Sequence, residues 1–410
     1  MKPTPLRVAH AEAVLAELLR FARPADQTLS IHFRRNRMLG QQDRAFVAEA
    51  AFAVLRRKRS LAAAVGGTTP HALLVAALVR VFGLSGRVLG ADADLVSRLK
   101  SFSKERLTGA EQADLPDWLW ERLVSERGAA EAAAIAQGLL EQAPLDLRVN
   151  LAKIERAEAL AGLEFEAAAT RYSPAGIRLA GKPAINRHPL FERGAIEVQD
   201  EGSQLLAYLL APRRGEMVAD FCAGAGGKTL ALAVLMRGTG RVYAMDVSKA
   251  RLAGLAPRAA RAGISTVHSI VLAGENDLRA KRLADKLDRV LVDAPCSGFG
   301  TLRRNPDLKW RHDARAVTEL AAKQSRILAA AARLVKPGGR LVYATCSILA
   351  EENEEVAVRF SDSFPEFKAV SAGEVLKQQR IPLEQGARLQ LWPHQHGTDG
   401  FFAAVFERAR

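Results

Sequence analysis

The chain has 410 residues, of which 49% are hydrophobic and 25% charged, and its formal net charge is +14. This length allows two or three domains, and the composition is that of a globular protein rather than a disordered one. Its apolar runs are too short to span a bilayer and its first residues lack an apolar signal core, so we expect a cytoplasmic protein without a membrane partner. The basic charge favours RNA or DNA as partner, although some proteins are basic without binding a polyanion.

The N-terminal part of the chain, from about residue 6 to 112, has the three- and four-residue apolar spacing of helices and almost no strand signal. One such helix, predicted over Asp43–Leu55, runs into the basic segment Arg56–Arg59. That segment is either a solvated helix end or part of a phosphate-facing patch. The patch would include three nearby basic residues, Arg34, Arg35 and Arg37.

Pro116 opens a second region, in which short strands and helices alternate. The pattern predicts helices over 118–141 and 154–163, a strand over 147–149, and strand-like segments around Phe165 and Ile177. We therefore expect a small α+β module between about residues 113 and 190.

From about Phe191 the pattern becomes a regular alternation of strands and helices, which predicts a doubly wound, mostly parallel sheet. The turn residues Pro337-Gly338-Gly339 are expected to reverse the chain into the last strand. The predicted strands are 217–219, 242–245, 267–272, 290–292 and 341–344, and helices are predicted over 229–236 and 314–334.

A glycine-rich segment, Asp220–Thr229, joins the first of these strands to a helix. Such a turn lets a ligand approach the backbone and directs helix N-terminal amides at it. The second strand ends in Asp246, where a carboxylate typically binds the two hydroxyls of a ribose. An adenosine-type cofactor site is the favoured interpretation over a merely tight turn. A P-loop is excluded because Cys222 occupies the position of its first glycine.

Three cysteines, Cys222, Cys296 and Cys346, are too few and too widely spaced for a disulfide framework or a zinc site, so we expect a reducing compartment and no metal. All three lie at carboxyl ends of predicted strands, where open parallel sheets bind ligands. Buried filler cysteines could lie anywhere along a strand. The clustering therefore favours a nucleophilic role for Cys296 or Cys346, with Asp293 beside them, whereas Cys222 belongs to the cofactor turn.

Several blocks of the sequence resemble the Nol/Nop/Sun family of RNA cytosine-5 methyltransferases, and within it the bacterial RsmB (Sun/Fmu) type. The helical part resembles, more weakly, the NusB-like RNA-binding domain of bacterial members, and 147–150 resembles the small α+β module of the family. The catalytic blocks are Val198–Leu205, Cys222–Thr229, Asp293–Gly298, Arg304–Trp310, Thr345–Ser347 and Gly397–Phe402.

The resemblance implies three domains: a helical NusB-like RNA-binding domain at 1–112, a small α+β module at 113–190, and a Rossmann-like methyltransferase domain at 191–410. It implies S-adenosyl-L-methionine as cofactor, Cys346 as nucleophile and Cys296 as the residue that assists product release. From the residues alone these two roles are interchangeable, since DNA cytosine methylases use the Pro-Cys thiol. The implied cofactor-binding residues are Cys222, Ala223, Gly224, Ala225, Gly226, Gly227, Lys228, Asp246 and Asp293.

The chemistry of cytosine methylation explains why such a site needs a thiol. Carbon 5 of cytosine is a poor nucleophile, and a thiolate that adds to carbon 6 makes it electron-rich. A carboxyl group near ring nitrogen 3, for which Asp293 is a candidate, would stabilise the shifted charge. A base must then remove the proton from carbon 5 before the thiol can leave.

The sequence departs from the family pattern in two places. The proline of the usual Ala-Pro-Gly-Gly-Lys turn is missing from Gly224–Lys228, which makes the turn less rigid without adding bulk. The acidic residue expected after the third strand is displaced, and Glu275 is the candidate to replace it.

Two pairs of residues have more than one interpretation. Lys309 and Trp310 could pack a loop, or could hold a flipped base or its phosphate. His394 and His396 lack ligand-spaced companions, so surface positions are expected rather than a metal site.

We therefore expect a monomeric enzyme that methylates carbon 5 of a cytosine in small-subunit ribosomal RNA through a covalent cysteine adduct. Transfer RNA is the alternative substrate. A non-catalytic ribosome-assembly factor that uses only its RNA-binding face is the alternative function, and retention of both thiols argues against it.

Overall fold

A computed structural model describes residues 2–85 and 93–410 of the chain, which divides into two units. The first comprises residues 1–142 and 301–314, and the second comprises 143–300 and 315–410. In the sequence, residues 301–314 interrupt the second unit. In the structure they belong to the first unit. The three-domain boundaries near residues 112 and 190 stay predictions.

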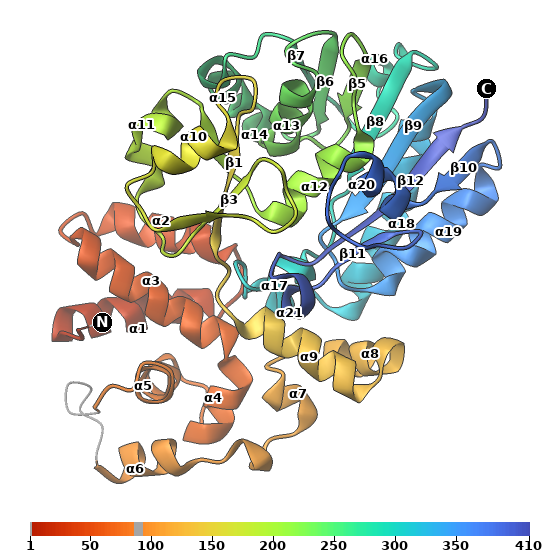
Figure 1. Cartoon of the computed structure of the whole chain (residues 1–410). Coiled ribbons are helices and arrows are strands. Elements are labelled where there is room, and N and C mark those ends of the chain that lie inside the picture. Colours follow the sequence, from red (N-terminus) through yellow and green to blue (C-terminus); the bar gives the residue numbers. More distant parts are fainter. Residues whose placement is uncertain (1, 86–92) are drawn as a thin grey trace. The chain divides into compact units, whose positions relative to one another are not determined.

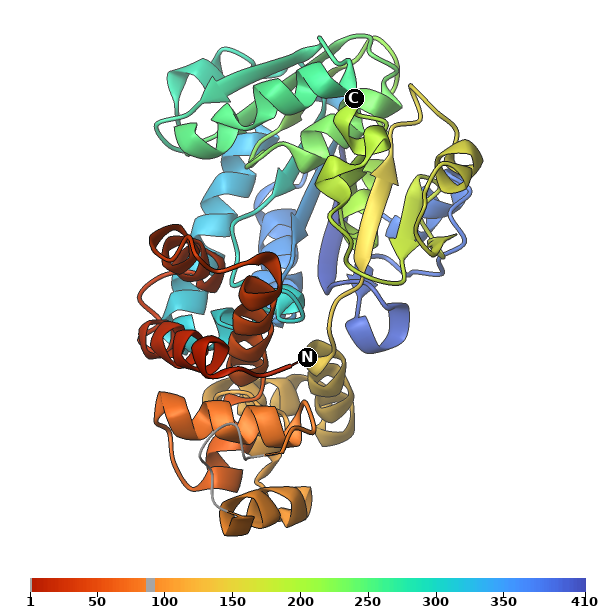
Figure 2. The ribbon, with the colours of Figure 1, turned by 90° about the vertical axis from the view of Figure 1, so that its left-hand side faces the viewer.

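The first unit is helical throughout its described part, as the apolar spacing predicted (Figure 2). Its core contains side chains such as Leu15, Phe46 and Leu74. The helix predicted over 118–141 is two helices, because Gly128 adopts φ 79° between them. The helices are α1 Pro5–Leu18, α2 Ala25–Arg35, α3 Gln41–Arg56, α4 Lys58–Val65, α5 Pro70–Arg80, α6 Ala93–Ser101, α7 Gly109–Gln112, α8 Asp117–Arg127, α9 Ala129–Leu140 and α17 Leu308–Arg311.

None of the helices within residues 2–85 and 93–410 is by itself long and apolar enough to cross a membrane. Helices α4 and α5 reach the required length and composition only as a pair, and they are bent by 98° with respect to each other.

The second unit begins with a small antiparallel sheet in the order β2-β3-β1-β4. Its strands are β1 Leu145–Val149, β2 Ala167–Ala169, β3 Gly176–Leu179 and β4 Ile196–Val198, and the helices α10 Arg156–Ala161 and α11 Pro189–Glu192 accompany them. The sequence predicted β1 and the region of β3 but missed β4. That strand is only three residues long, so its pattern is too short to read.

The large sheet has the order β10-β12-β9-β8-β5-β6-β7, with β11 paired to β12 (Figure 1). Strands β5 to β9 are parallel, which confirms the predicted doubly wound sheet, and β10, β11 and β12 are antiparallel additions. The bounds are β5 Met217–Asp220, β6 Arg241–Asp246, β7 Val267–Val271, β8 Leu287–Asp293, β9 Val335–Thr345, β10 Phe367–Val370, β11 Leu389–Leu391 and β12 Phe401–Arg408.

Helices cover both faces of this sheet. One face packs against α12 Glu201–Leu210, α13 Gly227–Leu235 and α20 Ala372–Gln378, and the other against α16 Leu278–Lys281, α18 Ala314–Ala332 and α19 Glu354–Ser363. The remaining helices of this unit are α14 Lys249–Ala253, α15 Leu255–Ala262 and α21 Pro393–His396. With both faces buried, the polar ligand site is restricted to the strand ends.

The segment Pro337-Gly338-Gly339, predicted as a turn that precedes the last parallel strand, lies inside β9 instead. It forms a bulge, because the pairing with β8 passes from Leu287–Val335 directly to Arg289–Arg340. Gly338 supplies the positive φ of 76° that such a bulge requires.

Candidate active site

The order of the parallel strands reverses between β5 and β8, and the carboxyl ends of these strands face a cavity of about 470 Å³. Open α/β sheets bind their ligands at this point. Six residues named from the sequence line the cavity together, namely Cys222, Asp246, Glu275, Asp293, Cys296 and Cys346. They come from five segments of the second unit, and the fold brings them to one cavity.

The glycine-rich turn after β5 lies so close to neighbouring side chains that two of its positions have no room for a Cβ atom. Gly224 and Gly226 have φ values of 55° and 84°, which only glycine adopts easily. A Cβ on Gly224 would lie 2.4 Å from Arg251 Nη2, and one on Gly226 would lie 2.2 Å from Leu255 Cδ1. The turn therefore depends on glycine at these two positions, where proline, with its fixed negative φ, would not fit.

Asp246 is oriented by two backbone amides at the end of β6. Its Oδ2 accepts the N–H of Gly224 at 2.8 Å and its Oδ1 accepts the N–H of Ser248 at 2.7 Å. Each oxygen keeps a further lone pair for a ligand hydroxyl. This arrangement fits the predicted contact with a ribose.

Lys228 and Asp293 form an ion pair, with Nζ and Oδ2 2.7 Å apart. Burial alone would lower the pKa of Lys228, but the carboxylate of Asp293 and the neighbouring Cys346 raise it above its ordinary value. Lys228 therefore stays positively charged inside the protein. Its ammonium also lies 5.7 Å from the centre of the Phe401 ring.

Cys296 and Cys346 meet at the same rim, with their Sγ atoms 3.4 Å apart. The hydrogen bond with Cys346 and burial together raise the pKa of the Cys296 thiol, so Cys296 keeps its proton at neutral pH. A thiol that holds its proton is a poor nucleophile.

The residue at the end of β5, Asp220, is completely buried and accepts a hydrogen bond from Thr229 Oγ1 at 2.7 Å. Burial raises the pKa of Asp220 to about 7. Near neutral pH this carboxyl group is therefore protonated about half of the time, which reduces the negative charge beside Asp293 and Asp246.

The cavity also contains residues that the sequence did not single out. Arg251, on the helix after Asp246, and Lys323, on α18, line it together with the apolar side chains of Leu272 and Ile327. Arg251 could have been found, since it lies in α14, the helix that directly follows Asp246 and β6. Lys323 could not, because nothing near it in the sequence marks a site.

Glu275, the candidate for the displaced acid, lines the cavity and forms an ion pair with Arg326 at 3.2 Å. Its neighbour Asp277 instead caps α16 through the backbone of Arg279. With Asp246 for a ribose, apolar residues for a base and a volume in the usual range for small-molecule sites, the cavity fits the predicted adenosine-type cofactor. Of the predicted cofactor-binding residues, Ala223, Gly224, Ala225, Gly226, Gly227 and Lys228 are not among the residues that line the cavity; they form the turn after Cys222 and the start of α13.

Lys309 and Trp310 lie in the first unit and bind the end of α3. Lys309 Nζ donates to the carbonyl of Arg56 and Trp310 Nε1 donates to that of Leu55, both at 2.8 Å. Lys309 is only 2% exposed. These contacts support the packing interpretation over that of a base-holding pair.

Most of the basic residues at the end of α3 also contact other residues of the first unit. Arg56 is buried and donates to the carbonyl of Arg303, Lys58 lies 4.8 Å from the centre of the Trp310 ring, and Arg59 pairs with Asp117. The continuous phosphate-facing patch considered from the sequence is therefore not formed by this run.

The two histidines near the C-terminus lie on α21 and are partly buried rather than on the surface. Nδ1 of His396 accepts the backbone N–H of Trp392 at 3.0 Å. Among the described residues no group of three or more His, Cys, Asp or Glu side chains is arranged to hold a metal ion.

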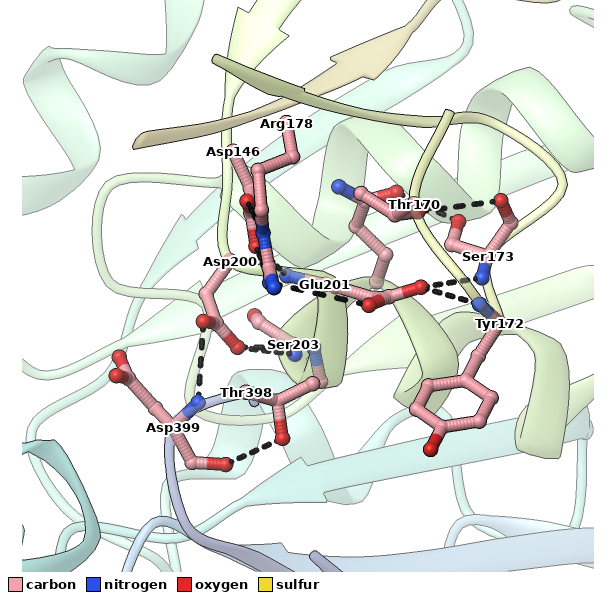
Figure 3. Close-up of polar contacts among 12 residues, drawn as sticks. Asp146, Thr170, Tyr172, Ser173, Arg178, Asp200, Glu201, Ser203, Thr398 and Asp399 are labelled. Carbon is pink, nitrogen blue, oxygen red and sulfur yellow. Dashed lines mark hydrogen bonds and ion pairs between the residues drawn. The ribbon is translucent and has the colours of Figure 1, made fainter. Parts of the chain in front are cut away.

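Two further sequence blocks, 198–205 and 397–402, build a polar network between the small sheet and the start of α12 (Figure 3). Asp200 caps α12 through the N–H of Gly202 and also accepts the N–H of Asp399. Glu201, 1% exposed, accepts the N–H groups of Tyr172 and Ser173. These blocks hold the scaffold together outside the cavity lining.

Comparison with known proteins agrees with this geometry. The family model described as 16S rRNA methyltransferase RsmB/F matches residues 207–407, and the model of the ferredoxin-like domain of RsmF/B-like methyltransferases matches 115–186. The probable ribosomal RNA small subunit methyltransferase B of Synechocystis sp. is 36% identical over 313 residues, which cover 75% of this chain and 69% of the relative.

Two other similarities extend over most of the chain. The ribosomal RNA small subunit methyltransferase B of Sodalis glossinidius is 35% identical over 316 residues, 75% of this chain and 70% of the relative. The crystal structure of PH0851 superimposes over 100% of both chains, with a TM-score of 0.79 and 27% identity. The predicted fold class is confirmed, and the chain belongs to the RsmB/F family of S-adenosyl-L-methionine-dependent RNA methyltransferases.

Proposed function

We propose that this protein transfers a methyl group from S-adenosyl-L-methionine to carbon 5 of a cytosine in small-subunit ribosomal RNA, through a covalent adduct with Cys346. The observation that carries the proposal is the pair of thiols, 3.4 Å apart, on the wall of a nucleoside-sized cavity that also contains Asp293. Methyl transfer to an oxygen or an amino nitrogen would need neither thiol. Activation of an inert ring carbon needs at least one.

The cofactor, when bound, supplies an electrophilic methyl group on a sulfonium sulfur. Cys346 is the nucleophile in this proposal, and its Sγ forms a bond to carbon 6 of the cytosine. Lys228 lies close enough to Cys346 for the two groups to interact electrostatically.

Asp293 stands where it can bind the edge of the ring while the electrons shift. Adduct formation moves a pair of electrons onto carbon 5, which then forms its bond to the methyl carbon as the bond from methyl to sulfur breaks. Ring nitrogen 3 can only accept a hydrogen bond, so Asp293 stabilises this change by taking up a proton and donating it to that nitrogen. Before the base binds, Lys228 holds the carboxylate of Asp293 through the ion pair.

Cys296 completes the reaction as the residue that assists release. After methyl transfer Cys296, having given its own proton to water, accepts the proton from carbon 5. The electrons of that C–H bond form the double bond to carbon 6, the bond between carbon 6 and Cys346 breaks, and its electrons return to sulfur. The raised pKa of Cys296 supports this role, because a sulfur that binds its proton tightly is a strong proton acceptor once it is ionised.

The first unit offers a candidate surface for the RNA. A cavity of about 580 Å³ between α2 and α3 is lined by Arg34, Arg37 and Arg44 together with Phe33 and Phe52. Arginines bind phosphates, and aromatic rings stack on unpaired bases. This surface replaces the run at 56–59 as the RNA-docking site that we propose.

Transfer of a radiolabelled methyl group tests the proposed function. Label should enter small-subunit ribosomal RNA with the native chain and should be lost with Cys346→Ala. Cys296→Ser should accumulate a covalent protein–RNA adduct, visible on a denaturing gel. Accumulation with Cys346→Ser instead would reverse the two roles.

The substrate is decided in cells. Bisulfite sequencing of RNA from cells that lack the protein should show one missing 5-methylcytosine in small-subunit ribosomal RNA. A missing site in transfer RNA would replace the proposed substrate. If no modified base is lost, the protein acts as an assembly factor and the proposed reaction is wrong.

A further inference from the structure

A buried carboxylate that has no part in the mechanism above lies at the residues that follow the two thiols. Glu352, at the end of the short turn Ala350–Glu352, is 0% exposed and is not among the residues that line the cavity. A buried ion must be compensated by hydrogen bonds, because the protein interior solvates charge poorly. The groups that donate hydrogen bonds to Glu352 therefore indicate its role.

Both oxygens of Glu352 accept hydrogen bonds from the residues after the cysteines. Oε1 accepts the backbone N–H of Ser297 at 2.8 Å. Oε2 accepts the hydroxyls of Ser297 and Ser347, each at 2.5 Å. Ser297 follows Cys296 and Ser347 follows Cys346, so one carboxylate binds the loops that carry both thiols.

The carboxylate is itself held from a third side. Gln324 on α18 donates to Oε1 at 2.9 Å and also to the carbonyl of Pro295 at 3.0 Å. The Tyr343 hydroxyl donates to the carbonyl of Glu352 at 2.5 Å. Glu352 is thus fixed to α18 and β9 as well as to both loops.

The two cysteine loops leave neighbouring parallel strands, β8 and β9, at the ends where the ladder of backbone hydrogen bonds stops. Four residues after Cys296, the backbone N–H of Gly300 donates to the carbonyl of Cys346 at 2.8 Å. Directly beside the thiols, the hydroxyls of Ser297 and Ser347 lie 3.2 Å apart, and Glu352 binds both of them. Glu352 thus adds a charged acceptor that is shared by the two loops.

We propose that Glu352 is a positioning residue that fixes the spacing of Cys296 and Cys346, so that both can act in turn on one base. The proposal rests on the proposed function for its consequence in catalysis but not for the geometry itself. A glutamine at this position keeps the volume and one oxygen for the backbone N–H of Ser297, but its amide N–H₂ replaces the oxygen that accepts both serine hydroxyls, so the charged acceptor shared by the two loops is lost.

The spacing can be measured without RNA or cofactor. Dibromobimane becomes fluorescent only when both of its arms have reacted with neighbouring thiols. In a Cys222→Ala background, used for this measurement only, we expect Glu352→Gln to lower the rate of cross-linking between Cys296 and Cys346 by about tenfold, because loosened reacting groups lose effective concentration.

Glu201→Gln is the matched control. Glu201 is 1% exposed and accepts two backbone N–H groups, from Tyr172 and Ser173, rather than any group of a cysteine loop. Glu201→Gln should lower the free energy of unfolding to a similar extent and leave the rate of cross-linking between Cys296 and Cys346 unchanged. The variant Ser297→Ala/Ser347→Ala removes the two hydroxyl groups that donate to Glu352. If Glu352→Gln does not fold, the cross-linking rate of this variant tests the proposal by itself.

A catalytic readout separates positioning from a merely structural role. With radiolabelled cofactor we expect Glu352→Gln to reduce kcat by about 10- to 100-fold with KM for RNA within a factor of two, and to raise the fraction trapped as covalent adduct. Native cross-linking rates in both Glu352→Gln and the serine variant would overturn the proposal. If cross-linking falls but the native chain forms no RNA adduct, the proposed function fails and the positioning of the thiols stands.

Discussion

Lys228 and Asp293 are separated by 65 positions in the sequence, yet their charged groups lie 2.7 Å apart at the carboxyl ends of two adjacent strands. The pair couples the cofactor turn to the strand end that precedes Cys296. We expect Lys228→Met to lower kcat by about 100-fold, as loss of a preorganised charge usually does, with little change in the KM for RNA.

The control for this prediction is a second lysine–carboxylate pair on the same sheet. Lys336 pairs with Asp288 at the opposite end of the strands, away from the cavity. Lys336→Met should leave kcat unchanged in the same methyl-transfer assay. Equal losses in both variants would mean that the Lys228 effect is one of folding.

Asp246 is expected to determine cofactor affinity. Asp246→Asn removes the charge and turns an amide N–H₂ towards one of the two backbone N–H groups that the carboxylate now binds. Hydrogen bonds to a charged group contribute about 1.5–3 kcal/mol, so the Kd for S-adenosyl-L-methionine should rise about 10- to 100-fold. Calorimetric titration measures this, with the exposed Asp362→Asn as control, and an unchanged Kd would exclude a contact with the ribose.

RNA binding should depend on the arginine-lined cavity of the first unit. Arg34→Ala/Arg37→Ala should weaken binding of small-subunit ribosomal RNA and reduce the slope of log affinity against log salt by about two, one for each lost phosphate contact. Arg98→Ala, an exposed arginine on α6 outside this cavity, is the control. A filter-binding titration at several salt concentrations would show an unchanged slope if RNA binds elsewhere.

Stability should depend on pH through Lys309. Burial lowers the pKa of Lys309 to about 7, whereas a lysine in the unfolded chain has its ordinary pKa of 10.5. Between these values the unfolded state binds more protons, so the free energy of unfolding should rise with pH, by at most about 1.4 kcal/mol per pH unit. Below pH 7 the full cost of the buried charge is present.

Urea unfolding of the native chain and of Lys309→Met between pH 6 and 9 isolates this contribution, because the other titrating groups are common to both proteins. As pH rises, the free energy of unfolding of the native chain should increase relative to that of Lys309→Met. A pH-independent difference would show that Lys309 keeps an ordinary pKa in the folded protein.

Local sequence patterns predicted the parallel strands and the glycine turn because these depend on near neighbours. Buried parallel strands read as short apolar runs, and the turn at Gly224 and Gly226 requires residues without a Cβ. The three antiparallel strands β10, β11 and β12 were missed. Their place in the sheet depends on pairing with β9 and with one another across long stretches of chain, which no local pattern encodes.

The motif around Lys309 and Trp310 is a case that local sequence patterns could not decide. A basic and an aromatic residue in the segment that follows a parallel strand in sequence are equally suited to hold a base or to pack. Only the folded chain places them against the carbonyls of Leu55 and Arg56, more than 200 positions earlier.

The sequence by itself determined the class of chemistry, because two cysteines and three aspartates at strand ends restrict what a parallel sheet can catalyse. Tertiary structure decided how those groups act on one another. It set the spacing of the two sulfur atoms, raised the pKa of Cys296, and directed the ammonium of Lys228 to Asp293. Charges and thiols respond to their neighbours in space and to burial, and both are properties of the folded chain alone.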